Sequence, residues 1–167
     1  MQLSPRKQRI MMEISTLLIP KYSRENLQWD PDDCNWIRIK KFHLPKGWLN
    51  KRRDSITSDK ETLYDTPYTP LLIEIPGGYP NVAPQNFYAE KQLQCGTDFI
   101  GHYFEQPGTG ITQQNKYTDK GWAWLCIHIK AWENKTNFVK GDNLLTVCKL
   151  IYDILSDKRN ARRNFYS

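Results

Sequence analysis

The chain has 167 residues, 39% of them hydrophobic and 25% charged, and its formal net charge is +6. This length suits a single domain that buries about two-thirds of its unfolded surface. No apolar run approaches the ~20 residues of a membrane span, so we expect a globular domain over residues 1–167. Because the N-terminus leads into an amphipathic pattern rather than the apolar block of a signal peptide, we expect the protein in the cytoplasm.

The cysteines and the basic residues exclude two further classes of site. The four cysteines are Cys34, Cys95, Cys126 and Cys148. They form no Cys-x-x-Cys pair and have no metal-ligand spacing with the histidines, so we expect neither a zinc site nor a disulfide framework. Much of the positive charge lies in residues 51–53 and in the tail at 158–163. A basic tail is more typical of a solvated chain end than of a nucleic-acid reader, so nucleic acid is not the expected partner.

The first predicted element is a helix of about four turns. Ser4 and Pro5 predict its start, because serine caps helices and proline is tolerated at the first helical position. Apolar residues then recur on one helical face: Ile10, Ile14, Leu17 and Leu18, with Met11 beside them. Pro20 predicts the end of this helix.

Three segments predict strands, and the segments between them predict loops. The strands are residues 36–42, 69–75 and 86–89. Residues 22–34, 51–60 and 79–84 predict loops, the last because its prolines cannot hold a regular ladder. Residues 95–120 contain four glycines and few aliphatic residues, which predicts a long irregular segment of the kind that is usually functional or mobile.

The candidate functional segment is residues 121–132. Cys126 and His128 are two residues apart, so in an extended segment both side chains project from one face. A thiol and an imidazole on one face provide a nucleophile and its proton acceptor. The tryptophans of this segment, which can shield the thiol from bulk water, are Trp122, Trp124 and Trp132. The alternative is a buried core cysteine, since free cysteine is among the most buried residue types.

Residues 143–156 predict a final helix, capped by Gly141 and Asp142. Its apolar face consists of Leu144, Cys148, Ile151 and Leu155, widened by Leu145, Val147, Tyr152 and Ile154. We therefore interpret Cys148 as a core residue and Asp142 as a helix cap rather than a catalytic acid. Helix, strands, irregular segment and helix in this order predict an α+β fold, an antiparallel sheet covered by helices.

Residues 73–87 resemble the ubiquitin-conjugating enzymes. A strand is followed by Tyr-Pro, a short spacer, a proline pair whose first member is replaced by Ala83, and an aromatic residue. Cys126 lies where that family has its catalytic cysteine, and Trp132 where it has a tryptophan after the active site. The resemblance covers about residues 4–157. It implies the ubiquitin-conjugating-like fold, with an antiparallel sheet of about four strands flanked by an N-terminal and a C-terminal helix, followed by a basic tail at 158–167.

The closer resemblance is to the bacterial branch of that superfamily. Residues 44–47, 75–80 and 140–144, together with the window around Cys126, are similar to prokaryotic conjugating-enzyme-like proteins of anti-phage CBASS-type defence operons. The resemblance implies a transferase that carries the C-terminal glycine of a partner protein as a thioester on Cys126 and passes it to an amine. The implied partner is a nucleotidyltransferase or a ubiquitin-like protein, with or without a separate activating enzyme. No cofactor is implied.

The chain departs from the family in one respect: it has no His-Pro-Asn before the cysteine. In the family the asparagine of that motif steadies the oxyanion, and one such donor is worth ~3–4 kcal/mol. The donors that remain are Asn115, the indole N–H of Trp122 or of Trp124, and backbone amides near Cys126. The sequence does not choose among them.

Two roles of His128 stay open. Its imidazolium form lowers the thiol pKa through an ion pair, or its neutral form accepts a proton from the incoming amine; otherwise it is an ordinary strand histidine. His102, in the irregular segment, is a weaker candidate for the same chemistry. The missing motif also leaves open a non-catalytic binding or scaffold module of the same fold. A cysteine protease is not expected, because a cysteine and a histidine two residues apart on one strand have the wrong geometry for its dyad.

Overall fold

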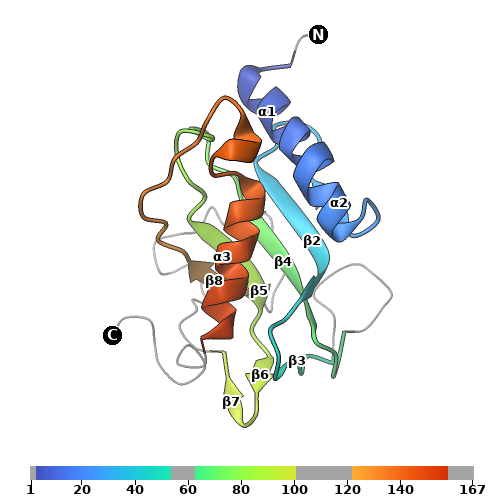
Figure 1. The fold of residues 1–167 in the computed structure, drawn as a ribbon. Coiled ribbons are helices and arrows are strands. Elements are labelled where there is room, and N and C mark those ends of the chain that lie inside the picture. Colours follow the sequence, from blue (N-terminus) through green and yellow to red (C-terminus); the bar gives the residue numbers. More distant parts are fainter. Residues whose placement is uncertain (1–2, 54–62, 101–121, 158–167) are drawn as a thin grey trace.

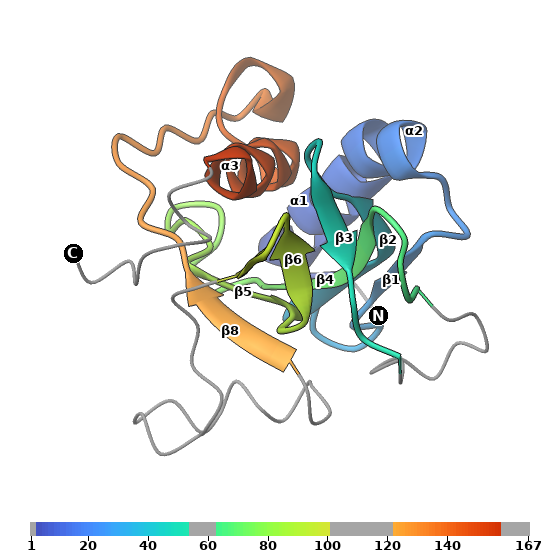
Figure 2. The ribbon, with the colours of Figure 1, turned by 90° about the horizontal axis from the view of Figure 1, so that it is seen from below.

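The structure is a computed structural model that describes residues 3–53, 63–100 and 122–157 (Figure 1). These residues form an α+β fold, as predicted, in which the helices lie together on one face of an antiparallel sheet (Figure 2). The sheet has five strands, one more than expected. No helix in the three described ranges is long and apolar enough to cross a membrane.

The five-stranded sheet has the order β1-β2-β4-β5-β8. Its strands are β1 (Leu27–Trp29), β2 (Trp36–His43), β4 (Tyr68–Glu74), β5 (Asn86–Glu90) and β8 (Trp122–Cys126). A smaller sheet joins β3 (Trp48–Asn50), β6 (Leu93–Cys95) and β7 (Asp98–Phe99) in the order β3-β6-β7. The predicted strands are confirmed to within about one residue at each end.

Four short strands were not predicted: β1, β3, β6 and β7. β1 lies in a segment expected to be loop, and β6 and β7 overlap the start of the segment expected to be irregular. Each has two or three residues, too few to show an alternating pattern, and each forms because a partner strand lies beside it. Most of the predicted loop at 51–60 and of the irregular segment at 95–120 lies outside the described residues.

The N-terminal helix begins as predicted and ends later than predicted. The Ser4 side chain accepts a hydrogen bond from the Lys7 N–H at 3.1 Å and caps α1 (Pro5–Glu13). The chain continues through a π-helical turn (Ile14–Leu18) into α2 (Ile19–Tyr22), so the prediction that Pro20 ends the helix is wrong. Pro20 lies in the first turn of α2, where a missing N–H costs little.

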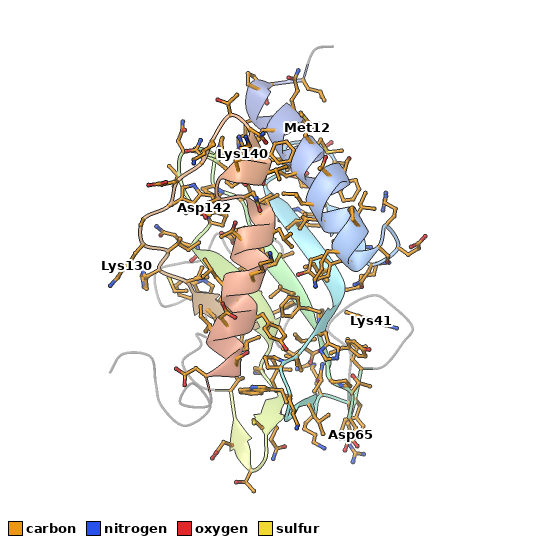
Figure 3. All side chains as sticks on the ribbon, viewed as in Figure 1. Met12, Lys41, Asp65, Lys130, Lys140 and Asp142 are labelled. Atoms are coloured by element: carbon orange, nitrogen blue, oxygen red, sulfur yellow. The ribbon has the colours of Figure 1, made fainter. Side chains whose placement is uncertain are left out.

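The C-terminal helix is α3 (Leu144–Ser156), as predicted. Its cap is Asn143, whose side chain accepts from the Thr146 N–H at 3.0 Å, rather than Gly141 and Asp142. Asp142, just before the helix (Figure 3), instead accepts from the Glu133 N–H at 2.7 Å. Cys148 is buried as expected, whereas Tyr152 of the predicted apolar face is 40% exposed.

A buried carboxylate joins the helices to the loop after β4. Glu13 is 0% exposed and accepts from the Tyr79 hydroxyl at 2.6 Å, the Leu144 N–H at 2.7 Å and the Arg9 Nε at 2.6 Å. A carboxylate is tolerated in a core only when hydrogen bonds and an opposite charge replace its water. We call Glu13 and these three donors the Glu13 cluster; it fixes α1, the loop and the start of α3 relative to one another.

Candidate functional site

The candidate nucleophile Cys126 is the last residue of β8, the edge strand beside β5. Side chains of a strand alternate between its two faces. Leu125 and Ile127 belong to the core beneath the helices, whereas Trp124 and Cys126 belong to a second cluster on the opposite face. The half-buried thiol therefore lies on the sheet face that the helices leave open.

A row of four side chains crosses the sheet at this end. The strand register places Trp36 of β2 opposite Glu74 of β4, and Asn86 of β5 opposite Cys126 of β8. Continuing the β4–β5 register by one position aligns Glu74 with Asn86. Because neighbouring strands are about 4.8 Å apart, these side chains are direct neighbours on one face. We call them the Cys126 row.

A second row of buried aromatic side chains supports the Cys126 row. Tyr88, which is 1% exposed, donates its hydroxyl to Oε1 of Glu74 at 2.7 Å. Trp124, which is 8% exposed, donates its indole N–H to Oδ1 of Asn86 at 3.1 Å. Buried tyrosine and tryptophan need a partner for their polar atoms. Here those partners are the carboxylate and the amide of the Cys126 row, whose orientations are fixed as a result.

Asn86 is a candidate site residue that was not predicted from the sequence. Its Oδ1 lies 3.8 Å from the Cys126 sulfur and accepts from the thiol as well as from Trp124. An indole N–H only donates, so the oxygen of the amide must face Trp124 and the nitrogen must face elsewhere. Within the described part of the chain, Asn86 Nδ2 donates no hydrogen bond. The local sequence gives no sign of this, because Asn86 and Cys126 are 40 residues apart.

Burial raises the pKa of the Cys126 thiol. A raised pKa keeps the resting thiol protonated at neutral pH, in agreement with its donation to Asn86. The predicted lowering of this pKa by an ion pair with His128 is therefore wrong. β8 ends at Cys126, and His128 is exposed in the following segment. A role of His128 towards an incoming amine stays a prediction.

The remaining candidates are the indole N–H groups of Trp124 and Trp122 and two residues outside the described ranges. The Trp124 indole N–H is used by Asn86, so Trp124 acts on the thiol through that amide. The Trp122 indole N–H has no hydrogen-bond partner among the described residues, but four residues along the strand separate it from Cys126, about 13 Å. Asn115 and the supporting candidate His102 lie outside the described residues.

One backbone donor of the predicted kind is the N–H of Cys126, the candidate nucleophile. The Ile127 N–H donates to the Gln85 carbonyl at 2.6 Å. Backbone groups of an antiparallel pair point alternately towards and away from the partner strand. The N–H of Cys126 consequently points away from β5, towards the outer edge of β8.

A cavity of about 380 Å³ adjoins the Cys126 row where β4 ends and β5 begins. Its polar wall is made by Asn35, Glu74, Gln85 and Asn86. An added Cβ on Gly77, which also lines the cavity, would meet no atom within 4 Å, so this side is open. The cavity is thus an open polar cleft that shares Asn86 with the thiol.

Arg6 of α1 fixes the wall of this cavity. Its guanidinium donates to the carbonyl of Ile75 at 3.1 Å, to the carbonyl of Pro76 at 3.1 Å and to Oδ1 of Asn35 at 3.2 Å. Each of these acceptors belongs to a residue that lines the cavity. A planar, multidentate donor of this kind holds several backbone segments in one arrangement.

Trp132 stabilises the neighbouring loop. Its indole N–H donates to the Pro80 carbonyl at 2.8 Å, and its ring lies 6.2 Å from that of Tyr79. Tyr79 is buried beneath this loop. Trp132 thus links the segment after β8 to the segment after β4, whereas Trp124 is the tryptophan that contacts the thiol's partner.

All four cysteines are free thiols. In the described ranges, no three His, Cys, Asp or Glu side chains converge in a way that could hold a metal ion. The chain matches no protein-family model, no curated protein sequence and no solved structure.

Proposed function

We propose that the protein is a cysteine-dependent acyl transferase of the ubiquitin-conjugating-like type. Cys126 carries the C-terminal glycine of a partner protein as a thioester and passes it to an amine. The observation that carries this proposal is the thiol held by Asn86, whose amide is itself fixed by a buried tryptophan. The order of helices and antiparallel strands is consistent with the ubiquitin-conjugating-like fold. The partner we propose is the nucleotidyltransferase of a bacterial CBASS-type defence system or a ubiquitin-like protein.

Acylation begins from a protonated thiol. The Cys126 sulfur attacks an activated carboxyl carbon, the S–C bond forms, and the bond to the leaving group breaks. The proton of the thiol departs with the leaving group. Asn86 Oδ1, which accepts from the thiol at 3.8 Å, orients the sulfur for this attack.

Asn86 also offers the oxyanion donor that the absent His-Pro-Asn motif would have supplied. Its Nδ2 carries two N–H donors on the same amide whose Oδ1 lies 3.8 Å from the sulfur. A fixed donor aimed at the developing oxyanion lowers the barrier by ~3–4 kcal/mol. We assign this role to Asn86.

The test uses a synthetic peptide thioester that ends in glycine as the acyl donor. We expect intact-mass spectrometry to detect a covalent adduct, cleavable by a thiol reductant, on the wild-type protein. Cys126→Ala should abolish it, while Cys34→Ala, Cys95→Ala and Cys148→Ala retain it. Cys148 is the sharpest of these controls, because burial raises its pKa to about 12. An adduct on the Cys126→Ala protein would reject the assignment.

One observation favours the second candidate, a non-catalytic binding module of the same fold. The pKa of Cys126 is raised rather than lowered, which is typical of a structural cysteine. Slow alkylation at neutral pH is expected under both proposals, so it does not separate them. Acyl transfer from the peptide thioester does, because a binding module forms no adduct at any pH.

A further inference from the structure

We propose that a second cavity, between α2, β2 and α3, binds a nucleoside 5′-monophosphate, with its base against three aromatic rings and its phosphate held by two lysines. The cavity has a volume of about 460 Å³, within the usual range for small-ligand pockets. It lies on the face of the sheet that the helices cover, whereas Cys126 lies on the opposite face. The proposal is therefore independent of acyl transfer at Cys126.

Three aromatic side chains, one from each of these elements, form the apolar part of the cavity. They are Tyr22 of α2, Phe42 of β2 and Tyr152 of α3. The ring centroid of Phe42 lies 6.3 Å from that of Tyr22 and 6.5 Å from that of Tyr152. Tyr152 is 40% exposed although it lies on the predicted apolar face of α3, so its ring is available to a ligand. Nucleobases are commonly held by stacking on such rings, because every base has a π-face.

The aromatic surface is positioned before a ligand arrives. The Tyr22 hydroxyl donates to the sulfur of Cys148, which is buried on α3 and also lines the cavity. This contact joins α2 to α3, while Phe42, 2% exposed, belongs to the core between them. A site whose groups are ordered in advance avoids the cost of ordering them on binding.

Two lysines provide the charge that a phosphate requires. Lys21 belongs to α2 and Lys149 to α3, the helices on either side of β2 (Figure 1). Among the described residues, no ion pair occupies either ammonium group. A phosphate monoester carries about −1.5 to −2 charge at neutral pH and three acceptor oxygens, so two lysines can share it. A carboxylate has a single charge that one lysine can match, so the pair favours a phosphate.

A carboxylate lines the same cavity and selects another part of the ligand. Asp153 follows Lys149 by one helical turn. A carboxylate repels phosphate and accepts hydrogen bonds from hydroxyl groups, so it requires a part of the ligand that carries hydroxyls. The two adjacent hydroxyls of a ribose meet this requirement. A planar ring, a pair of hydroxyls and a dianion in one small molecule describe a nucleoside monophosphate.

The first arm of the experiment titrates adenosine 5′-monophosphate (AMP) into the full chain and measures binding by calorimetry. We expect saturable binding at one site. Adenosine, which lacks the phosphate, and inorganic phosphate, which lacks the ring, should each bind about tenfold more weakly or worse. Equal affinity for AMP and either of these two compounds would overturn the proposal. A 5′-phosphorylated oligonucleotide that binds tenfold more tightly than AMP would also overturn it, because the site would then recognise a strand end.

The second arm uses substitutions at exposed positions of the cavity. Lys21→Ala and Lys149→Ala should each weaken AMP binding about tenfold. The matched control is Lys130→Ala, on the exposed connection between β8 and α3 (Figure 3), which should leave AMP binding unchanged. Tyr152→Leu keeps an apolar side chain and removes the ring, so it should weaken AMP and adenosine alike by about fivefold or more. Equal losses for Lys130→Ala and Lys149→Ala would show that AMP responds only to the net charge of the protein.

Amide NMR spectra locate the bound nucleotide and separate this proposal from the proposed function. AMP should shift the backbone amide signals of Tyr22, Phe42 and Lys149 and leave that of Cys126 unchanged. We expect the same AMP affinity in the Cys126→Ala protein, and wild-type acylation of Cys126 in the Lys149→Ala protein. AMP binding by a protein that forms no thioester would reject the proposed function alone. Acylation without AMP binding, or AMP shifts confined to residues around Cys126, would reject the nucleotide site alone.

Discussion

The Glu13 cluster and the Cys126 row lie on opposite faces of the sheet. They differ in how far their polar groups are enclosed. Glu13 is completely buried and accepts from three donors on three separate segments. Asn86 is partly exposed, receives the Trp124 indole and the thiol, and borders an open cavity. A saturated, closed cluster stabilises the fold, whereas an oriented group beside open space is available for a ligand. The comparison separates structural from functional polar residues.

The largest expected effect is a loss of stability when the Glu13 cluster is disrupted. Glu13→Ala leaves the Arg9 Nε, the Leu144 N–H and the Tyr79 hydroxyl without the acceptor that they share. Removing one partner of a buried charge pair costs about 3–5 kcal/mol, so we expect a loss of this size in the free energy of unfolding by urea denaturation. Tyr79→Phe removes a single donor and should cost about 1–2 kcal/mol.

The matched control is Glu25→Ala, because Glu25 is exposed. Its free energy of unfolding should lie within about 0.5 kcal/mol of the wild-type value. Equal stability of the Glu13→Ala and Glu25→Ala proteins would show that the Glu13 cluster does not hold the helices and the loop together.

The next largest effect is expected on the acylation of Cys126 when Asn86 is replaced. Asn86→Ala removes the orienting acceptor and the oxyanion donor, and loss of one such donor lowers the rate about 100-fold, or ~3 kcal/mol in the barrier. We expect that fall in the acylation rate of Cys126 by the glycine-peptide thioester. Asn86→Asp keeps the acceptor for Trp124 but loses the N–H donors. It should therefore be as slow as Asn86→Ala, while a fast Asn86→Asp protein would mean that Asn86 only orients the thiol.

The comparison also explains what could be predicted from the sequence. The cap of the first helix, the apolar faces of the first and last helices, and strands of five or more residues such as β2 and β4 follow from local sequence patterns. Strands of two or three residues show no such periodicity. The π-helical turn that carries the chain past Pro20 is not visible in the spacing of the apolar residues.

Cys126 was chosen as the candidate nucleophile from its order in the chain, but its hydrogen-bond partner could not be predicted from the sequence. Asn86 is 40 residues away, and Glu74 is 14 residues from the Tyr88 that orients it. These pairs meet only through the register of antiparallel strands, which a single sequence does not reveal. His128 was chosen because it is near in sequence, but it is exposed beyond the end of β8, and burial is the cause of the Cys126 pKa shift.

A smaller effect tests whether the aromatic layer orients the site. Trp124→Phe keeps most of the buried ring and removes the indole N–H that Asn86 accepts. We expect acylation of Cys126 to slow about tenfold, close to 1.4 kcal/mol, because the amide is no longer held in one orientation. Trp122→Phe is the control on the same strand face, since its indole N–H has no partner among the described residues. If both variants acylate at the same rate, the Trp124 contact does not position Asn86.

The pH dependence of Cys126 alkylation tests the effect of burial. Because burial raises the thiol pKa, the folded protein should need a higher pH than the unfolded value of ~8.5 to react with iodoacetamide at half its maximal rate. The raised thiol pKa also makes the stability of the fold depend on pH. The unfolded thiol ionises first, so the contribution of Cys126 to stability is fully present below the unfolded pKa and is lost as the pH rises through the folded one. Half-maximal alkylation of the folded protein below the value for the urea-unfolded protein would reject this account.

The smallest effect concerns His128. It is exposed beyond the end of β8, and burial is the cause of the raised Cys126 pKa, so His128→Ala should leave the alkylation profile unchanged. If its neutral imidazole accepts a proton from the incoming amine, aminolysis of the loaded thioester should be about two- to fivefold slower in His128→Ala than in wild type. His128→Gln keeps hydrogen bonding without a basic ring nitrogen, so it should behave as His128→Ala. Equal aminolysis rates for all three proteins would return His128 to an ordinary surface residue.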